Sequence, residues 1–323
     1  MHIPPTMSET EYRFRRKLSN DLGDVFMNAL EDQTTMDLFL NPDGTLWQEC
    51  FGQPVKKIGS IPAGRAESAI RTVAGCLDAL VTPLSPILEG ELPLDGSRFA
   101  GWIPPIVSAP SFAIRKKAQK IFTLNDYVAY GILSNEQHSI LCNGVSTREN
   151  ILVIGSTGSG KTTLTNALIQ EIVKQSPLER ILIIEDTFEI QCEAENTLLF
   201  HTTRNVSMTD LLRTSLRAKP DRILIGEVRG PEALDLLDTW NTGHEGGVAT
   251  LHANNAVSAL DRLQSLIGRH PQAPRKSNDI KSLIGMVVDI IVHIARDEQQ
   301  GRKVKSVMKL NGFNGKSYQM ESI

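Results

Sequence analysis

The sequence predicts an α/β protein of two domains, in which a smaller α+β domain precedes a larger domain built on a parallel sheet. Three observations predict this. The length of 323 residues exceeds the usual size of one domain. The second half contains near-continuous apolar runs, typical of parallel strands buried on both faces, at 151–154, 181–184, 223–225 and 287–294. Helical patterns separate most of these runs, as expected where helices cover a parallel sheet.

The first 115 residues combine helical and strand patterns. A helix is predicted from about residue 10 to 40 by the helical spacing of Leu18, Leu22, Phe26 and Leu30. Residues 36–47 predict a hairpin, because Pro42 and Gly44 supply the φ values that a tight turn needs. A second amphipathic helix over 66–80 and short strands broken by proline and glycine over 83–115 complete a small α+β domain.

The two domains are predicted at 1–120 and 121–323. The polar run 115–120 (RKKAQK) is the candidate linker, because a charged run of this kind is usually a solvated face. At the other end of the second domain, 304–320 predicts antiparallel strands, and they turn either at Asn311-Gly312 or at Asn314-Gly315.

The composition excludes several classes of protein. The 34 Lys+Arg against 37 Asp+Glu give a net charge of −3, which disfavours a protein whose whole surface binds nucleic acid. The four cysteines form no CxxC pair, so neither a zinc site nor a disulfide framework is indicated. The N-terminus has no apolar core of a secretory signal, and no run is long enough to span a bilayer. We therefore expect a soluble cytoplasmic protein whose membrane contact is peripheral.

The segment 155–162 (GSTGSGKT) matches the P-loop pattern G-x-x-x-x-G-K-[ST] at every fixed position, between a strand and a helix. Its glycines let backbone N–H groups surround phosphate oxygens at a helix N-terminus. Lys161 would reach the β- and γ-phosphates of ATP, and the Thr162 hydroxyl would bind Mg²⁺. The alternative is a glycine-rich turn with an incidental lysine. The predicted nucleotide-binding residues are Gly155, Ser156, Thr157, Gly158, Ser159, Gly160, Lys161, Thr162 and Thr163.

Hydrolysis of a bound nucleotide needs a group that positions water, and two acidic strand ends are candidates. Glu185 and Asp186 follow the run 181–184, at the edge where open α/β sheets bind ligands. Glu227 follows 222–225 in an hhhhGE pattern, where an acid can hold the Mg²⁺ shell. A lone acid at a strand end is more often a turn cap. Two of them downstream of a P-loop favour catalysis.

Histidines and arginines supply further candidates. His252 ends a short apolar run, where it is either a structural residue or a donor to the γ-phosphate. A metal site formed with His244 would need a third ligand, and none stands at sensible spacing. Arg213 and Arg217 lie four residues apart on a helix that begins with a capping box at Ser207. They are either surface residues paired with acids or arginine fingers directed at phosphate.

Taken together, these segments resemble the secretion (traffic) ATPases of type II and type IV systems. The P-loop GSTGSGKTT, the acidic box IIEDTFEI, the stretch LRTSLRAKPDRILIGEVRG and the histidine box TGHEGGVATLHANNA occur in the family's order over roughly residues 120–295. The stretches ILEGELPLDGSRFAGWIPPIVSAPSFAIRKKA and WNTGHEGG look most like the TrbB-type conjugal transfer ATPases, relatives of the VirB class. The tetracysteine zinc element of the type II branch is absent, which favours the type IV branch.

The resemblance implies a homohexamer in which N-terminal domains stack on RecA-like P-loop C-terminal domains. ATP and Mg²⁺ would lie between the two domains of one subunit, and domain closure would drive pilus assembly or substrate transfer. The partners implied are channel components of a secretion or conjugation system at the cytoplasmic face of the bacterial inner membrane. Direct sequence-specific binding of nucleic acid is not expected.

The resemblance also implies a role for individual residues. Glu185 would polarise the attacking water, and Glu227, the Walker B acid, would hold Mg²⁺ together with Thr162. The other residues carried over by motif are His252 of the histidine box, Arg213 and Arg217 before the second acidic strand, and Arg115 as the N-terminal-domain arginine at the nucleotide.

Other functions are compatible with a P-loop. A nucleotide-gated scaffold would bind ATP and assemble the channel with little turnover. A RecA-like DNA translocase predicts DNA-stimulated hydrolysis and an electropositive pore, which neither the net charge nor any long basic segment supports. A small-molecule kinase fits less well, because no arginine-rich lid follows the P-loop and the acidic and histidine boxes would have no role.

Overall fold

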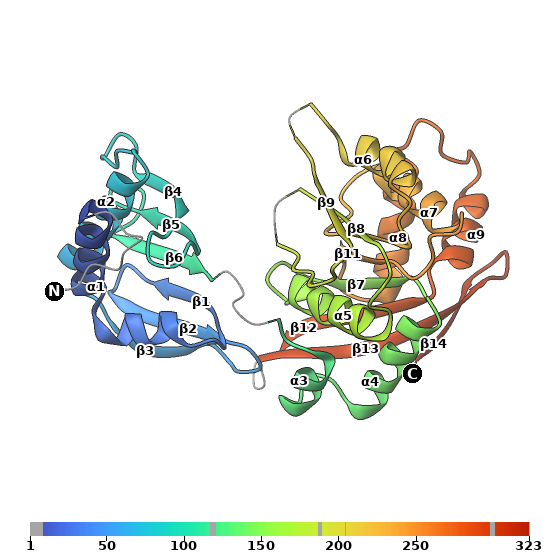
Figure 1. Ribbon diagram of the computed structural model, residues 1–323, viewed down its shortest axis with the longest axis horizontal. Helices are drawn as coiled ribbons and strands as arrows, with labels where there is room; N and C mark the ends of the chain where they lie inside the picture. The colour runs from blue at the N-terminus through green and yellow to red at the C-terminus, as the bar shows by residue number, and fades with distance from the viewer. Residues whose placement is uncertain (1–8, 117–120, 187–188, 204, 298–300, 323) are drawn as a thin grey trace. The chain divides into compact units, whose positions relative to one another are not determined.

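The computed structural model describes residues 9–116, 121–186, 189–203, 205–297 and 301–322. The chain divides into two compact units, Met1–Lys120 and Ile121–Ile323, each with its own sheet and hydrophobic core (Figure 1). Within the described ranges, no helix is both long enough and apolar enough to cross a bilayer.

The first unit is an antiparallel sheet of six strands that packs with two helices. The strand order is β3-β2-β1-β6-β5-β4. The strands are β1 (Thr35–Leu40), β2 (Thr45–Cys50), β3 (Lys56–Ser60), β4 (Ile87–Glu91), β5 (Arg98–Trp102) and β6 (Ser111–Arg115), and the helices are α1 (Glu9–Glu31) and α2 (Ala63–Cys76). Helix and strand side chains share one core, in which Phe26 of α1 packs edge-on against Phe112 of β6.

Helix α1 buries the face predicted from its apolar spacing, but it ends earlier than expected. The expectation of a helix up to residue 40 is wrong, because the chain turns after Glu31. The carboxylate of Asp32 accepts a hydrogen bond from the Thr34 backbone N–H at 2.8 Å, and this local turn competes with further helix. The hairpin prediction is confirmed, with Gly44 at a φ of +79° between β1 and β2.

One residue of the predicted linker, Lys116, is buried rather than solvated. Lys116 follows β6 and is only 7% exposed, so the expectation of a solvated face is wrong at this residue. Its Nζ donates to the backbone oxygen of Asp32 at 2.8 Å, which gives the buried ammonium a partner. Residues 117–120, the rest of the predicted linker, lie outside the described residues.

The second unit is a mixed sheet of eight strands, in the order β14-β13-β12-β7-β11-β10-β8-β9. Neighbours from β12 to β9 are parallel, whereas β13 and β14 are antiparallel additions beside β12. The strands are β7 (Ile151–Gly155), β8 (Ile181–Glu185), β9 (Thr197–His201), β10 (Arg222–Ile225), β11 (Val248–His252), β12 (Ile290–Asp297), β13 (Gly301–Phe313) and β14 (Tyr318–Ser322).

Helices cover both faces of this sheet. Every second strand residue, such as Leu152, Leu182 and Ile223, packs into one core with α6 (Met208–Ser215), α7 (Glu232–Trp240), α8 (Ala256–Ile267) and α9 (Ser277–Val287). The strand residues between them are also buried. Helix α5 (Lys161–Gln175) contacts β7 and β11, but none of its buried residues belongs to that core. It therefore covers the other face of the sheet (Figure 1). The short helices α3 (Leu124–Ala129) and α4 (Asn135–Ser146) contact α5.

The predicted strands are largely confirmed, with two differences. The run 287–294 starts as the end of α9 and becomes strand only at Ile290. Strand β9 was not expected, because Thr197–His201 is an edge strand of half-buried residues without a continuous buried run. Of the two possible C-terminal turns the second is correct, since the Asn314 side chain accepts the N–H groups of Lys316 and Ser317 between β13 and β14.

Candidate nucleotide-binding site

The P-loop connects β7 to the 15-residue helix α5. Strand β7 ends at Gly155 and α5 begins at Lys161, so the loop's backbone lies at a helix N-terminus. Gly158 and Gly160 have φ angles of +71° and +98°, which residues with a Cβ rarely adopt. A Cβ on Gly160 would also lie 2.8 Å from Cδ of Arg302, so both backbone and space require glycine here. A loop of this shape can bind phosphate through its N–H groups.

The predicted residues of three other strands lie along the same edge of the sheet. His252 ends β11 and is paired in register with Gly155 of β7. Glu227 follows β10, which is the other neighbour of β11, and Glu185 ends β8, the next strand along. The carboxyl ends of parallel strands meet at one edge, so these side chains and the P-loop share one side of the unit.

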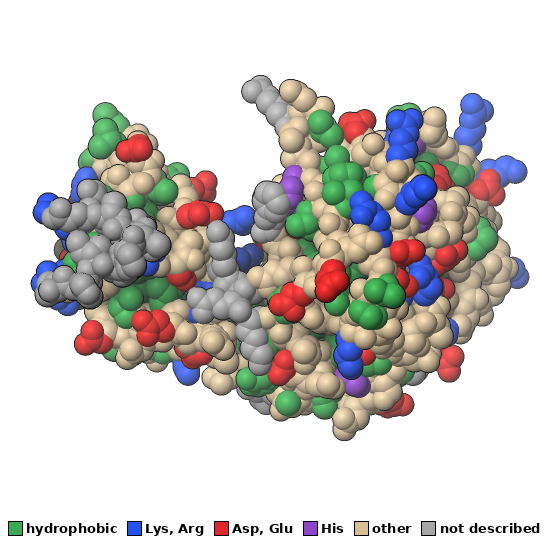
Figure 2. Space-filling view, viewed as in Figure 1, with side chains coloured by type: hydrophobic (Ala, Val, Ile, Leu, Met, Phe, Trp, Pro, Cys, Tyr) green, Lys and Arg blue, Asp and Glu red, His purple; other side chains and the backbone are tan. Residues whose placement is uncertain are grey.

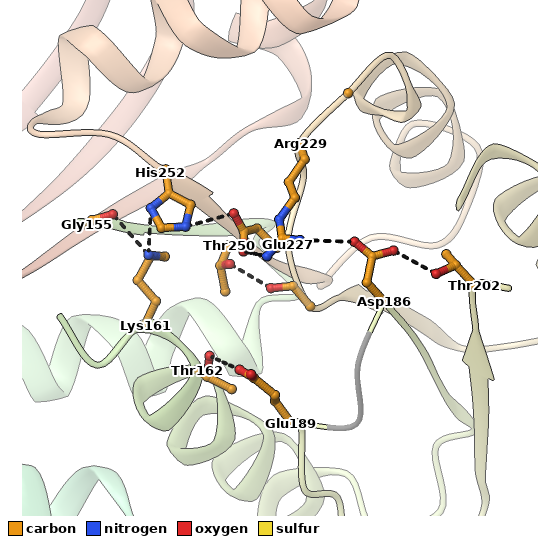
Figure 3. Close-up of polar contacts among 12 residues, drawn as sticks. Gly155, Lys161, Thr162, Asp186, Glu189, Thr202, Glu227, Arg229, Thr250 and His252 are labelled. Carbon is orange, nitrogen blue, oxygen red and sulfur yellow. Dashed lines mark hydrogen bonds and ion pairs between the residues drawn. The ribbon is translucent and has the colours of Figure 1, made fainter. Parts of the chain in front are cut away.

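A chain of polar contacts joins the P-loop lysine to His252 and Glu227 (Figure 3). Lys161 Nζ donates to the backbone oxygens of Gly155 at 3.1 Å and Ser156 at 3.0 Å, and it lies 3.3 Å from His252 Nδ1. An ammonium can only donate, so Nδ1 accepts and the proton is on Nε2, which lies 2.9 Å from Glu227 Oε1. Burial, and then the Lys161 charge, lower the pKa of His252, which keeps the ring neutral near pH 7.

The contacts continue beyond Glu227 through Arg229 to Asp186, the second acid of the predicted strand end, and to Thr202. Arg229 donates to Glu227 Oε2 at 2.7 Å, and this hydrogen bond raises the pKa of the arginine. The same guanidinium lies 3.5 Å from Asp186 Oδ2, and Asp186 Oδ1 accepts from the Thr202 hydroxyl at 2.9 Å. Arg229 lies two residues after Glu227 in the GEVRG stretch, so its proximity to that acid was the available signal.

Glu185 is buried, and its carboxylate holds the backbone of Glu189 and Ile190. The residue is only 3% exposed. Its carboxylate accepts hydrogen bonds from the backbone N–H groups of Glu189 at 3.0 Å and Ile190 at 2.8 Å. Burial raises the pKa of this carboxyl above its usual range, although the two N–H donors oppose the shift. A carboxylate with a raised pKa at this edge can act as a base.

Glu189 is the acid that contacts the predicted magnesium ligand. Its Oε2 accepts from the Thr162 hydroxyl at 3.4 Å (Figure 3). Glu189 is not among the residues predicted from the sequence, although it lies in the same acidic segment IIEDTFEI as Glu185. The Glu185 carboxylate holds the backbone of Glu189, so the two acids are parts of one arrangement.

The two arginines before the second acidic strand do not share one helix. Helix α6 begins with the predicted capping box at Ser207 but ends at Ser215, and Arg217 lies in the 3₁₀ turn Leu216–Ala218. The expectation that Arg213 and Arg217 occupy one helix face is therefore wrong, because the helix tightens before Arg217. Arg213 Nε lies 3.3 Å from Asp235 Oδ1, and Arg217 is exposed.

The remaining candidates, His244 and Arg115, each have a polar contact within their own unit. Nδ1 of His244 lies 2.9 Å from the backbone oxygen of Pro220, and the described ranges hold no group of three His, Cys, Asp or Glu side chains poised for a metal. Arg115 ends β6 in the first unit, with its Nε 3.4 Å from Asp37 Oδ1.

Comparison with known families decides the wider identity of the chain. The model of the family described as "Type II/IV secretion system protein" matches residues 88–315. The chain belongs to this family. This type II/IV secretion system protein is 44% identical over 310 residues to the probable conjugal transfer protein TrbB of Sinorhizobium fredii, covering 96% of this chain and 94% of that protein. It is 33% identical to the type IV secretion system protein PtlH of Bordetella pertussis, covering 86% and 90%.

A solved structure supports the same assignment. The VirB11 ATPase from the Brucella suis type IV secretion system, in complex with sulphate, is 26% identical to this type II/IV secretion system protein. The TM-score is 0.51, and the likeness covers 94% of this chain and 97% of that one. The family resemblance and the two-domain P-loop ATPase fold expected from the motifs are both confirmed.

Proposed function

We propose that this chain hydrolyses ATP with Mg²⁺ and acts as a homohexameric motor of a conjugal transfer or type IV secretion system. The observation that carries the proposal is the chain of contacts from Lys161 through His252 to Glu227. It joins the P-loop lysine to the histidine at the end of β11 and to the acid after β10. An incidental glycine-rich turn would not need these groups.

The P-loop residues are proposed to bind the phosphates of ATP. Lys161 now donates to two carbonyl oxygens of its own loop, and phosphate oxygens would take their place. That exchange moves the ammonium relative to His252 Nδ1, which it contacts at 3.3 Å. A shift of the ammonium would move the His252 ring, and with it the Nε2–H that contacts Glu227, so phosphate binding would alter the position of that acid.

Thr162 and Glu227 are proposed to hold Mg²⁺, with Glu189 beside them. The donors fit this ion, since a hydroxyl and carboxylates are hard oxygen ligands and Mg²⁺ is usually held by few protein groups together with substrate phosphates. The ion would neutralise charge on the phosphates when bound. One carboxylate oxygen of Glu227 contacts His252, which in turn contacts the P-loop lysine, and the other contacts Arg229.

Glu185 is proposed to take the proton of the attacking water. Burial raises the pKa of Glu185, which makes its carboxylate a stronger base than an exposed one, and its backbone donors fix the carboxylate in place. Glu189 is a second candidate for this role, favoured by its contact with Thr162. Arg115, Arg213 and Arg217 are proposed to stabilise phosphate charge, with Arg213 and Arg217 acting from a neighbouring subunit.

The wider role is proposed from the relatives. The names of the relatives tie them to conjugal transfer and type IV secretion, so we propose channel components of such a system as partners and the cytoplasmic face of the bacterial inner membrane as the location. On the face seen in Figure 2, acidic and basic side chains of the second unit are interspersed, and the chain's net charge is −3. This supports a subunit that does not itself bind DNA with sequence specificity.

Phosphate release from Mg-ATP by the purified chain tests the proposal, with Lys161→Ala as control and the oligomer mass measured in the same samples. We expect turnover that rises with hexamer content and falls at least about 100-fold in the control. A stable hexamer that releases no more phosphate than Lys161→Ala would identify a scaffold instead. Turnover that requires added DNA would identify a translocase.

A further inference from the structure

Two arginines from the far end of the chain contact the backbone of the P-loop. Arg302 of β13 donates to the carbonyl oxygen of Gly158 from Nε at 3.4 Å and from Nη2 at 3.2 Å. Arg296 of β12 donates to the same oxygen from Nε at 3.3 Å. Three N–H donors from two cations thus converge on one P-loop carbonyl.

The sheet places these arginines beside the loop. Strand β12 pairs with β7, the strand that leads into the P-loop, and Arg296 is opposite Arg302 in the pairing of β12 with β13. Two residues after Arg302, the N–H of Val304 donates to the backbone oxygen of Ile132 at 2.9 Å, which ties β13 to the α3–α4 connection. The backbone around Arg302 is therefore held by β12 on one side and by the α3–α4 connection on the other.

Arg302 is buried, whereas Arg296 is exposed. Arg302 is 5% exposed, and its Cδ lies so close to Gly160 that a Cβ there would be 2.8 Å away. Its charge also acts on the fully buried Tyr127 of α3, where it opposes the effect of burial on the tyrosine pKa. Burial of a guanidinium is costly unless its donors are used, and two of them are directed at the Gly158 carbonyl.

The Gly158 carbonyl and the Ser159 N–H belong to one planar peptide and point in opposite directions. The Ser159 N–H donates to the Ser156 oxygen at 3.2 Å, and Lys161 Nζ donates to that same oxygen at 3.0 Å. The Ser159 N–H and the Lys161 ammonium are therefore both directed at the Ser156 oxygen. Fixing the carbonyl from the other side fixes the direction of this N–H.

We propose that Arg302 is a positioning residue that holds the Gly158–Ser159 peptide so that its N–H faces the phosphates of a bound nucleotide. Arg296 supports it at the same carbonyl. The inference rests on the proposed function only in that the P-loop binds nucleotide phosphates. A loop ordered in advance lowers the cost of binding, so the effect falls on ADP and ATP affinity more than on the turnover of bound ATP.

The test compares Mg-ADP affinity, kcat and melting temperature of the full chain with those of Arg302→Met, Arg302→Lys and Lys305→Met. Arg302→Met keeps the aliphatic stem and removes the donors, whereas Arg302→Lys keeps the charge and loses the two-pronged geometry. Lys305 is the matched control, because it lies on the same strand, is 38% exposed and pairs with Asp297.

We expect Arg302→Met to weaken Mg-ADP binding about tenfold or more, with kcat at saturating ATP within about threefold and an unchanged melting temperature. Arg302→Lys should weaken binding about threefold, and Lys305→Met should bind as the unaltered chain does. If Arg302→Met binds Mg-ADP as tightly as the unaltered chain, the inference is overturned. If Arg302→Met does not fold, unaltered Mg-ADP affinity in Arg302→Lys overturns it instead. A chain that binds ADP in this pattern but never hydrolyses ATP contradicts the proposed function and supports the inference.

Discussion

The hydroxyl of Thr162 donates to a carboxylate oxygen of Glu189 at 3.4 Å. The acid in contact with the predicted Mg²⁺ ligand is therefore not one of the acids predicted from the strand ends. The buried Glu185 carboxylate accepts the Glu189 N–H at 3.0 Å, which holds the backbone of Glu189 close to the end of β8. In the acidic segment, Glu185 thus holds backbone N–H groups, whereas Glu189 contacts Thr162 beside the P-loop lysine.

Glu189→Gln should change how hydrolysis depends on Mg²⁺. The amide keeps the side chain's size and one acceptor but removes the charge that would favour the cation beside Thr162. We expect the Mg²⁺ concentration for half-maximal phosphate release to rise about fivefold or more, with kcat at saturating Mg²⁺ reduced by less than about tenfold. Glu195→Gln, an exposed site shortly before β9, is the control. Identical Mg²⁺ curves for the two variants would remove Glu189 from the metal site.

The pH dependence of stability should show the environment of His252. Its folded pKa lies below the ordinary value of about 6.5, so the unfolded chain takes up the proton first as pH falls. The contribution of His252 to stability is therefore present above about pH 6.5 and is lost as pH falls through the lowered folded pKa. The loss should stay below about 1 kcal/mol, because the side chain is 40% exposed and water screens its neighbours.

Urea unfolding of the full chain and of His252→Gln at pH 7.5 and 5.5 measures this contribution. The free energy of unfolding of the full chain should fall more on acidification than that of the variant. An equal fall in both proteins, or a larger fall in the variant, would show that the histidine is not held neutral by burial and Lys161.

Mixed oligomers should reveal whether Arg217 acts across a subunit boundary. Arg217 is exposed in a 3₁₀ turn, so its side chain is open to contact from another chain. If it reaches the nucleotide of a neighbour, Arg217→Ala and Lys161→Ala chains should each be inactive alone but regain activity when mixed, because some interfaces then hold both intact residues. Mixing Lys161→Ala with Thr214→Ala, on the exposed face beside it, measures recovery from subunit exchange alone. No recovery beyond simple dilution in the Arg217 mixture would place this arginine outside the neighbour's site.

The parallel core and the P-loop were predictable because their signals are local. Strand residues such as Ile181–Ile184 are buried on both faces, so the sequence there is apolar without alternation. The P-loop glycines carry conformations that few other residues adopt, so the pattern itself indicates the shape. The edge strand β9 gave no such signal, because it is half exposed and does not need a continuous apolar run.

The contacts that complete the site depend on residues far apart in the chain. Arg302 reaches Gly158 only through the pairing of β13 with β12 and of β12 with β7, which no local pattern encodes. Lys116 is charged in sequence yet buried, because the Asp32 carbonyl from another segment receives its ammonium. Arg217 falls outside α6 because the helix changes to a 3₁₀ turn, and helix ends are the least certain part of a sequence-based assignment.

The most direct test of the account is the rate of phosphate release by Glu185→Gln in the presence of Mg-ATP, measured beside its affinity for Mg-ADP. Glu185 carries the raised pKa expected of a base, and glutamine can still accept a backbone N–H but cannot take a proton. We expect turnover reduced at least about 100-fold, with ADP affinity within about threefold of the unaltered chain. Near-normal turnover in Glu185→Gln would contradict it.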